Sequence, residues 1–359
     1  MSAPARGPLP RPDYRELSPY APDRRPVEID LSDNTNLWGT HPDALAVIRG
    51  ADTDALARYP SLYADALRQA VARRHGVKVD QVTTGCGSDD VLDSLWRSLA
   101  EYGGTVTHVA PTFSMVEPLS RMNGREARPV AWSRALADPE TLFEGDPLMV
   151  YLCRPNNPTG LQAPSEWVER VLEIAGDDGP VVLIDEAYAD FATDAWIPRV
   201  TRYPRALAVR TLSKAYGLAG LRVGYGVGSA SLIAEIEKSR GPYKVSRLAE
   251  AAAVAALDDR GGWVERTVHE CVENRARLRA ALDDRGTPAP PSSANFVLLP
   301  VEAGRAVPTV HALREFEVGA RPFPDCPDVG DAIRVTVGPW PMMERFLAAW
   351  DTVRTGESR

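Results

Sequence analysis

The sequence lacks the features of a secreted or membrane protein. Its 359 residues contain no apolar run near the roughly 20 residues that cross a bilayer. Residues 1–25 are rich in proline and arginine and lack the apolar centre of a signal peptide. Cysteine is scarce, and Cys86, Cys153, Cys271 and Cys326 form no CxxC pair, which argues against a disulfide framework. We therefore expect a cytoplasmic protein with no membrane partner.

Positive charge is also in deficit. The chain has 41 Lys and Arg residues against 49 Asp and Glu residues, so its formal net charge is -8, and it has no long basic run. This balance disfavours a nucleic-acid partner. No internal repeat and no metal-ligand cluster is recognisable. Hydrophobic residues make up 44% of the chain, which is typical of a globular protein, and the length is sufficient for two domains.

Short apolar segments alternate with helical patterns through the middle of the chain. We predict strands at 81–84, 105–109, 148–153, 181–184, 206–211 and 223–227. Near-continuous apolar strands between helices predict a mostly parallel sheet that is covered on both faces. A helical pattern at 54–75 is interrupted at Pro60, and another runs from the Gly87 loop to about residue 101.

The pattern changes after about residue 232. Long helices are predicted at 246–257 and 263–282, strands at 295–299 and 332–337, and further helices at 307–317 and from 342. We therefore predict an α/β protein with a flexible tail and N-terminal arm at 1–40, a large domain at 41–245 and a smaller α+β domain at 246–359.

Lys214 lies just past the end of the predicted strand at 206–211. In open parallel sheets, ligands bind beyond the carboxyl ends of the strands. An apolar pocket disfavours an ammonium ion, so a lysine there can act as a neutral nucleophile. A neutral amine on a rigid element is what a Schiff base with an aldehyde cofactor requires.

A second feature is the turn from the strand at 81–84 into a helix through Gly87, Ser88 and Asp89. Free backbone N–H groups and the positive end of the helix dipole make such a turn an anion site. Ser88 and Asp89 are also ordinary helix caps. Both interpretations, a phosphate site and a helix cap, fit this turn.

Polar residues at the other strand ends suit a pyridoxal phosphate cofactor. Asp185 follows a buried strand, and a buried carboxylate requires a partner such as a protonated pyridine nitrogen. Asn157 and Tyr188 are placed to bond the phenolic oxygen of the ring, and Phe113 and Ala187 to cover its two faces. Each of these residues also has an ordinary role in a turn, cap or core, but their combination predicts the cofactor.

Donors for the phosphate group of such a cofactor also follow the strands. Thr211 and Ser213 offer hydroxyl groups, and Arg222 offers a guanidinium group. Together with the Gly87 turn they complete the predicted cofactor site around Lys214.

These motifs identify a family. The chain resembles the aspartate aminotransferase superfamily, the class I and II aminotransferases of fold-type I, and within it the histidinol-phosphate aminotransferases. The resemblance runs from about residue 20 to the last helix. It is carried by residues 34–39, 58–60, 85–89, 111–113, 155–160, 185–188, 210–225, 242–246, 294–296 and 333–338.

The resemblance implies a homodimer with active sites at the subunit interface. In such a dimer Tyr59 reaches the cofactor phosphate of the other subunit, and Arg334 holds the substrate carboxylate. The planar fork of an arginine suits a carboxylate, although a surface ion pair is the ordinary alternative. Tyr20, Asn36 and Arg321 are further candidates for binding the substrate.

The chain departs from the family pattern near the expected substrate pocket. Thr35 and Leu37 stand where the family often has Glu and Pro, and Lys244 stands where it often has Asn. Residues 339–341, Pro-Trp-Pro, replace the usual threonine and acidic residues. Thr35 and Leu37 are expected to affect side-chain selection, and Lys244 either adds positive charge near the substrate or points to solvent.

The resemblance implies a transaminase that moves an amino group between an amino acid or amine, such as histidinol phosphate, and a 2-oxo acid. Lys214 would serve as nucleophile and as general acid and base. Three alternatives stay open: a decarboxylase of the threonine-phosphate type, a transaminase of a specialised pathway, and a regulator that senses the cofactor. Such regulators carry a DNA-binding domain, for which the short N-terminal segment leaves no room.

Overall fold

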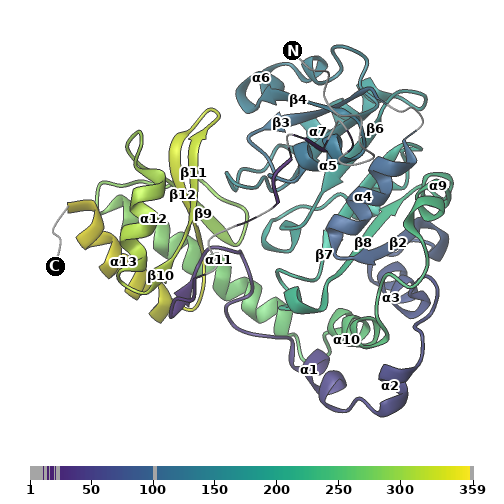
Figure 1. Cartoon of the computed structure of the whole chain (residues 1–359), viewed down its shortest axis with the longest axis horizontal. Coiled ribbons are helices and arrows are strands. Elements are labelled where there is room, and N and C mark those ends of the chain that lie inside the picture. Colours follow the sequence, from purple (N-terminus) through teal and green to yellow (C-terminus); the bar gives the residue numbers. More distant parts are fainter. Residues whose placement is uncertain are drawn as a thin grey trace, which may run out of the picture.

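The apolar segments in the middle of the chain form one seven-stranded sheet, in the order β2-β8-β7-β6-β5-β3-β4 (Figure 1). The computed structural model describes residues 11, 14–15, 17–19, 21, 25–99 and 103–355. The strands of this sheet are β2 (Val82–Cys86), β3 (Thr105–Ala110), β4 (Glu126–Ala131), β5 (Met149–Cys153), β6 (Val181–Asp185), β7 (Ala206–Thr211) and β8 (Val223–Gly228). All pairs except those made by β8 are parallel, so the predicted mostly parallel sheet is confirmed.

Both faces of this sheet are apolar and covered by helices. Val182 and Ile184 of β6 belong to one buried cluster, whereas Val181 and Leu183 belong to another, because successive side chains of a strand point to opposite faces. The second cluster is completed by α4 (Ser88–Ser98), α5 (Val116–Met122) and α9 (Ala230–Arg240). The first is completed by α3 (Asp65–His75), α7 (Ser165–Ala175), α8 (Ile197–Val200) and α10 (Arg247–Asp258).

A second, antiparallel sheet has the order β11-β12-β9. Its strands are β9 (Phe296–Pro300), β11 (Arg321–Cys326) and β12 (Gly330–Thr336). The N-terminal strand β1 (Ile29–Asp30) pairs with β10 (Val318–Gly319) beside this sheet, as Figure 1 shows by the purple arrow next to β10. The segment at Ile29–Asp30 is therefore bound to the last third of the chain.

The remaining helices connect or flank the two sheets. They are α1 (Pro42–Arg49), α2 (Thr53–Ala57), α6 (Trp132–Ala137), α11 (Trp263–Asp283), α12 (Ala306–Arg314) and α13 (Trp340–Thr355), with short 3-10 turns at Val79–Gln81, Pro139–Leu142, Ala189–Phe191 and Ala219–Leu221. None of the helices in the described ranges is long and apolar enough to cross a membrane.

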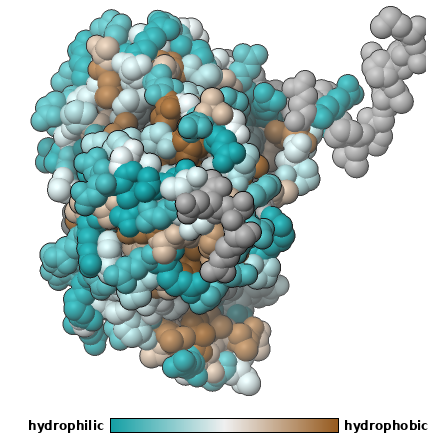
Figure 2. Space-filling model, turned by 90° about the vertical axis from the view of Figure 1, so that its left-hand side faces the viewer, coloured by the Kyte–Doolittle hydropathy of each residue, from teal (hydrophilic) through white to brown (hydrophobic). Residues whose placement is uncertain are grey.

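The surface in Figure 2 is largely hydrophilic, with apolar residues gathered at its foot, at the level of α1 and α2 in Figure 1. In α2 and the segment that follows it, the exposed large apolar side chains are Leu56, Tyr59 and Leu62. Gathered exposed apolar side chains are typical of a contact surface.

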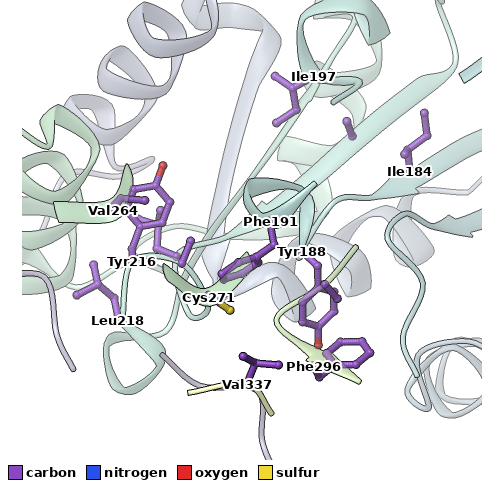
Figure 3. Close-up of a cluster of buried hydrophobic side chains, with 14 of the residues drawn as sticks. Ile184, Tyr188, Phe191, Ile197, Tyr216, Leu218, Val264, Cys271, Phe296 and Val337 are labelled. Carbon is purple, nitrogen blue, oxygen red and sulfur yellow. The ribbon is translucent and has the colours of Figure 1, made fainter. Parts of the chain in front are cut away.

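The two sheets share a buried core. Tyr188, which follows β6, packs edge-on against Phe296 of β9, with ring centroids 5.1 Å apart. Figure 3 shows these two rings side by side, in a cluster that also includes Ile184 and Cys271. The small sheet is thus held against the carboxyl ends of the large one.

Most predicted elements are present, with ends that differ by one to a few residues. The helical pattern at 54–75 forms two helices, α2 and α3, separated by the segment that contains Pro60. Strands β1, β4, β10 and β11 were not predicted. All four cysteines are free thiols. The domain limits at 40 and 245 stay a prediction, and most of the predicted tail lies outside the described residues.

Candidate active site

A cavity of about 760 Å³ lies at the carboxyl ends of β5, β6 and β7. Its walls also include residues of β11 and β12 and of the loop before α1. Most predicted site residues line it: Ser88, Asp89, Phe113, Asn157, Asp185, Ala187, Tyr188, Thr211, Ser213, Lys214, Arg222, Arg321 and Arg334. The fold therefore brings the predicted residues into one wall, although Ser88 and Arg334 are 246 positions apart in the sequence.

Lys214 extends into this cavity from the turn after β7. Its Nζ donates a hydrogen bond to the main-chain oxygen of Asp33, at 2.9 Å. Burial and the positive charge of Arg334 lower the pKa of Lys214 to about 8, although the carboxylates of Asp33 and Asp89 act in the opposite direction. About a tenth of this amine is therefore neutral at pH 7, and the neutral form is the one that a nucleophile or base requires.

Asp185 ends β6 with a buried carboxylate. Its Oδ2 accepts a hydrogen bond from the hydroxyl of Tyr151 at 2.6 Å, and its Oδ1 accepts one from the backbone N–H of Ala187 at 3.0 Å. Burial raises the pKa of Asp185 to about 6, and both of these hydrogen bonds lower it. Within the described ranges no cation forms an ion pair with this carboxylate, so it suits a cationic group in the cavity.

Arg334 projects from β12 toward the same space. Its Nη1 donates to Oδ1 of Asn157 at 2.5 Å and its Nη2 to the main-chain oxygen of Ser32 at 2.7 Å. The guanidinium also lies 5.3 Å from the ring centre of Phe296 and 5.4 Å from that of Phe323. These contacts fix a buried cation at the cavity wall, where it can bind an anionic group.

Part of the cavity wall is rich in hydrogen-bond donors. Thr211 donates to Ser213 at 2.9 Å, and Arg222 contacts both the hydroxyl of Ser213, at 3.4 Å, and the carboxylate of Asp89, at 3.3 Å. The N-terminus of α4, which begins at Ser88, faces the same place. Hydroxyls, a guanidinium and a helix N-terminus together favour a phosphate group.

Gly87 makes this donor cluster possible. Its φ of 82° is in the left-handed region, and a Cβ added to it would lie 2.5 Å from Nη2 of Arg222. Only glycine therefore allows the backbone and the guanidinium to approach this closely.

Tyr188 is buried in the cavity wall, and its hydroxyl accepts a hydrogen bond from the side-chain amide of Asn34 at 3.0 Å. Burial raises the pKa of Tyr188 to about 12, so this phenol stays protonated and can donate. Phe113 and Ala187 line the cavity as well.

Of the other candidate residues, Asn36 and Tyr59 do not line the cavity, and the role of Tyr59 at a partner subunit stays a prediction. Asn36 does not line the cavity and instead donates to the main-chain oxygen of Ala215 at 2.9 Å. Tyr59 lies on the surface with 78% of its area exposed and packs against the Tyr243 ring at 4.9 Å. Tyr20 lies outside the described residues.

Lys244 forms an ion pair with Asp90 at 3.0 Å, so it is neither directed to solvent alone nor part of the cavity wall. Of the two departures in the loop before α1, Thr35 lines the cavity. Leu37 packs against Gly338, where an added Cβ would lie 2.7 Å from Leu37 Cδ1.

Sequence reasoning did not assign Tyr151, Asn34 or Asp33 to the site. Tyr151 lies within an apolar strand, where a tyrosine is usually a core residue. Its hydroxyl could have pointed to the site, because a buried hydroxyl requires a hydrogen-bond partner. Asp33 contributes a backbone oxygen, which no side-chain pattern reveals.

Comparison with known proteins agrees with this geometry. The model of the family described as "Aminotransferase class I and II" matches residues 26–349. The chain is 35% identical to histidinol-phosphate aminotransferase of Gluconacetobacter diazotrophicus, over 91% of this chain and 92% of the relative. It is also 35% identical to histidinol-phosphate aminotransferase 2 of Rhizobium meliloti, over 94% and 97% of the two chains.

A solved structure is similar over its whole length. The histidinol-phosphate aminotransferase of Sinorhizobium meliloti, determined in complex with pyridoxal-5'-phosphate, superposes with a TM-score of 0.87 and 25% identity over 100% of both chains.

Proposed function

Because the chain belongs to the class I and II aminotransferases and is a pyridoxal phosphate-dependent transaminase, we propose that it transfers an amino group between histidinol phosphate, or a related amino acid or amine, and a 2-oxo acid. The observation that carries this choice is that the wall of the Lys214 cavity contains two cations, Arg321 and Arg334, as well as the apolar side chains of Phe113 and Met115. This wall suits a substrate with an anionic end and a flat or apolar body.

The residues of the cavity fit the cofactor. Its phosphate suits the hydroxyls of Thr211 and Ser213, the guanidinium of Arg222 and the N-terminus of α4. The carboxylate of Asp185 suits the ring nitrogen in its protonated form. When bound, the cofactor supplies an aldehyde for amine exchange and a ring that withdraws electrons from the substrate.

Each remaining part of the reaction falls to a residue of this chain. With the cofactor bound, the neutral amine of Lys214 would hold its aldehyde carbon. Once the amine of the substrate takes that place, Lys214 Nζ would accept the proton of the substrate α-carbon and deliver it to that same aldehyde carbon, on the other side of the transferred nitrogen. The main-chain oxygen of Asp33 orients Nζ. Asn157 and Tyr188, which are held by Arg334 and Asn34, would donate to the ring oxygen, and Arg334 would bind the anionic end of the substrate.

Spectra of single turnovers test the substrate. The enzyme loaded with cofactor is mixed in turn with histidinol phosphate, glutamate, aromatic amino acids and threonine phosphate. We expect histidinol phosphate to convert the cofactor to its amine form together with release of a keto product. If only another amine converts the cofactor to its amine form, that amine is the substrate and histidinol phosphate is not. Release of carbon dioxide with the cofactor spectrum restored would identify a decarboxylase.

We further propose that two copies of the chain form a dimer through the surface that carries Leu56, Tyr59, Leu62 and Tyr243. All four side chains are exposed in the single chain, although apolar groups favour burial. In this dimer Tyr59 lies at the cofactor phosphate of the partner chain. Sedimentation velocity is expected to give twice the mass of 39.1 kDa.

Hybrid dimers test the exchange of Tyr59. Tyr59→Ala and Lys214→Ala proteins are each expected to be poorly active or inactive. After mixing under conditions that exchange subunits, about a quarter of the sites regain both native residues. A mixture that is no more active than its components would contradict the shared site.

The cytoplasmic location that we also propose is checked by cell fractionation.

A further inference from the structure

The hydroxyl of Tyr151 contacts the carboxylate of Asp185, and Tyr151 itself does not line the cavity. Strands β5 and β6 are parallel neighbours in which Tyr151 is level with Leu183 and Cys153 is level with Asp185. Residues two apart on a strand share a face, so Tyr151 and Asp185 project to the same side of the sheet. The Tyr151 hydroxyl and Asp185 Oδ2 are 2.6 Å apart.

The tyrosine has little freedom to move. Its side chain has no exposed area, and its ring packs 6.2 Å from that of Trp96 on α4. The indole of Trp96 is in turn fixed by a 3.0 Å hydrogen bond to Ser120 on α5. Two helices therefore hold the phenol at the carboxylate.

Among the residues that the structure describes, one donor orients each oxygen of Asp185. Oδ2 accepts from Tyr151 and Oδ1 accepts from the N–H of Ala187, while the residue also lines the cavity. A carboxylate oxygen accepts two hydrogen bonds. One acceptor position on each oxygen is therefore left for a group in the cavity.

We propose that Tyr151 is a positioning residue for transamination, which orients Asp185 and stabilises it as a carboxylate so that the proton stays on the ring nitrogen of the cofactor. A buried carboxylate that loses a donor becomes a stronger base. It would then draw the proton from the ring nitrogen onto its own oxygen. A ring without that proton is a poorer electron sink.

The electrostatics of the site agree with this geometry. Burial raises the pKa of Asp185, and the hydrogen bond from Tyr151 is the largest cause that opposes the rise. Burial also raises the pKa of Tyr151 itself well above its usual value, so the phenol stays protonated as the donor. The proposal depends on the cofactor and is independent of the substrate named above.

A cofactor analogue separates positioning from general support of the fold. Apoenzymes with Tyr151→Phe are titrated with pyridoxal phosphate and with its analogue in which carbon replaces the ring nitrogen, and dissociation constants are measured from absorbance. For the natural cofactor we expect Tyr151→Phe to weaken binding about tenfold, the usual scale for a hydrogen bond to a charged group. For the analogue, which has no nitrogen for Asp185 to hold, we expect a change of less than about twofold.

Tyr225→Phe is the matched control. Tyr225 is also buried in the large sheet, and its hydroxyl bonds to His75 at 2.9 Å, outside the cavity wall. This change removes the same atom and is expected to leave both dissociation constants unchanged. Circular dichroism and thermal melting verify that each variant is folded.

A double variant tests whether Tyr151 acts through Asp185. Adding Tyr151→Phe to Asp185→Asn is expected to change the affinity for the natural cofactor by less than about twofold, because the carboxylate is already lost. Equal losses for both cofactors, or an unchanged affinity for the natural one in the single variant, would overturn the proposal. A full tenfold loss in the Asp185→Asn background would overturn it as well.

Discussion

Covalent capture of the cofactor by Lys214 should follow the titration of its own amine. With a pKa of about 8, about a tenth of the amine is neutral at pH 7, against about one part in 2,500 for an ordinary lysine. The apoenzyme should therefore bind the aldehyde roughly 200 times faster at pH 7 than an exposed lysine of the same nucleophilicity would.

The structure also names the groups responsible. Burial is the largest cause of the lowered pKa, and the positive charge of Arg334 is the next. Arg334→Gln should therefore raise the pKa of Lys214, move the midpoint of the capture rate upward and slow capture at pH 7. Arg321→Gln removes another cation from the same cavity wall, but its charge is not among the main causes of the shift. It is the matched control and should leave the midpoint in place.

Stopped-flow absorbance provides the assay. Apoenzyme is mixed with excess cofactor from about pH 6 to about pH 10, and the rate of the covalent phase is fitted to a single titration. Lys214→Ala supplies the signal of noncovalent binding for subtraction. A rate that keeps rising beyond pH 9 without a midpoint near 8, or an Arg334→Gln midpoint equal to the native one, would refute the reasoning.

Three further perturbations follow from the site and its supports. Gly87→Ala should weaken cofactor binding about tenfold or more in equilibrium titrations, because the new Cβ meets Arg222 and the φ of 82° is strained; undiminished affinity would contradict the close approach. Arg334→Lys should raise the KM for the 2-oxo acid about tenfold in steady-state kinetics, since a lysine cannot bind a carboxylate with two parallel hydrogen bonds, and an unchanged KM would argue against this carboxylate site. Glu186→Gln should lower the free energy of unfolding in urea by about 2 kcal/mol, because it removes the charge that pairs with buried Arg210; a loss below about 0.5 kcal/mol would mean that the pair is not needed.

The sequence alone was sufficient to predict those site residues whose position follows from the order of strands and loops in the parallel sheet. Asp185 and Lys214 each follow an apolar strand, and the carboxyl ends of parallel strands meet at one edge. Their side chains therefore converge whatever the details of the loops. Contacts between distant segments could not be predicted in this way. The bond from Asn34 to Tyr188 joins residues 154 positions apart, and the oxygen that Asp33 presents to Lys214 depends on the path of the backbone.

Two of the missed strands, β4 and β11, share a physical reason. β4 contains Pro129, and β11 contains Pro322 and Pro324, whereas proline usually argues against a strand. Both strands lie at the edge of their sheets, where one side of the backbone makes no ladder hydrogen bonds and proline is tolerated. A local pattern does not reveal which strand will be at an edge.

The pairing of β1 with β10 sets an order of events during synthesis. The strands of the large sheet, from Val82 to Gly228, can assemble while the rest of the chain is still being made. Ile29, however, pairs with Val318, and the backbone N–H of Asn34 bonds to the side chain of Thr336, 302 positions later. The carbonyl of Asp33 thus reaches Lys214 only after nearly the whole chain has left the ribosome. Cofactor loading into the finished pocket is therefore a late step, and a nascent chain that stops before β12 carries the lysine without its oxygen partner.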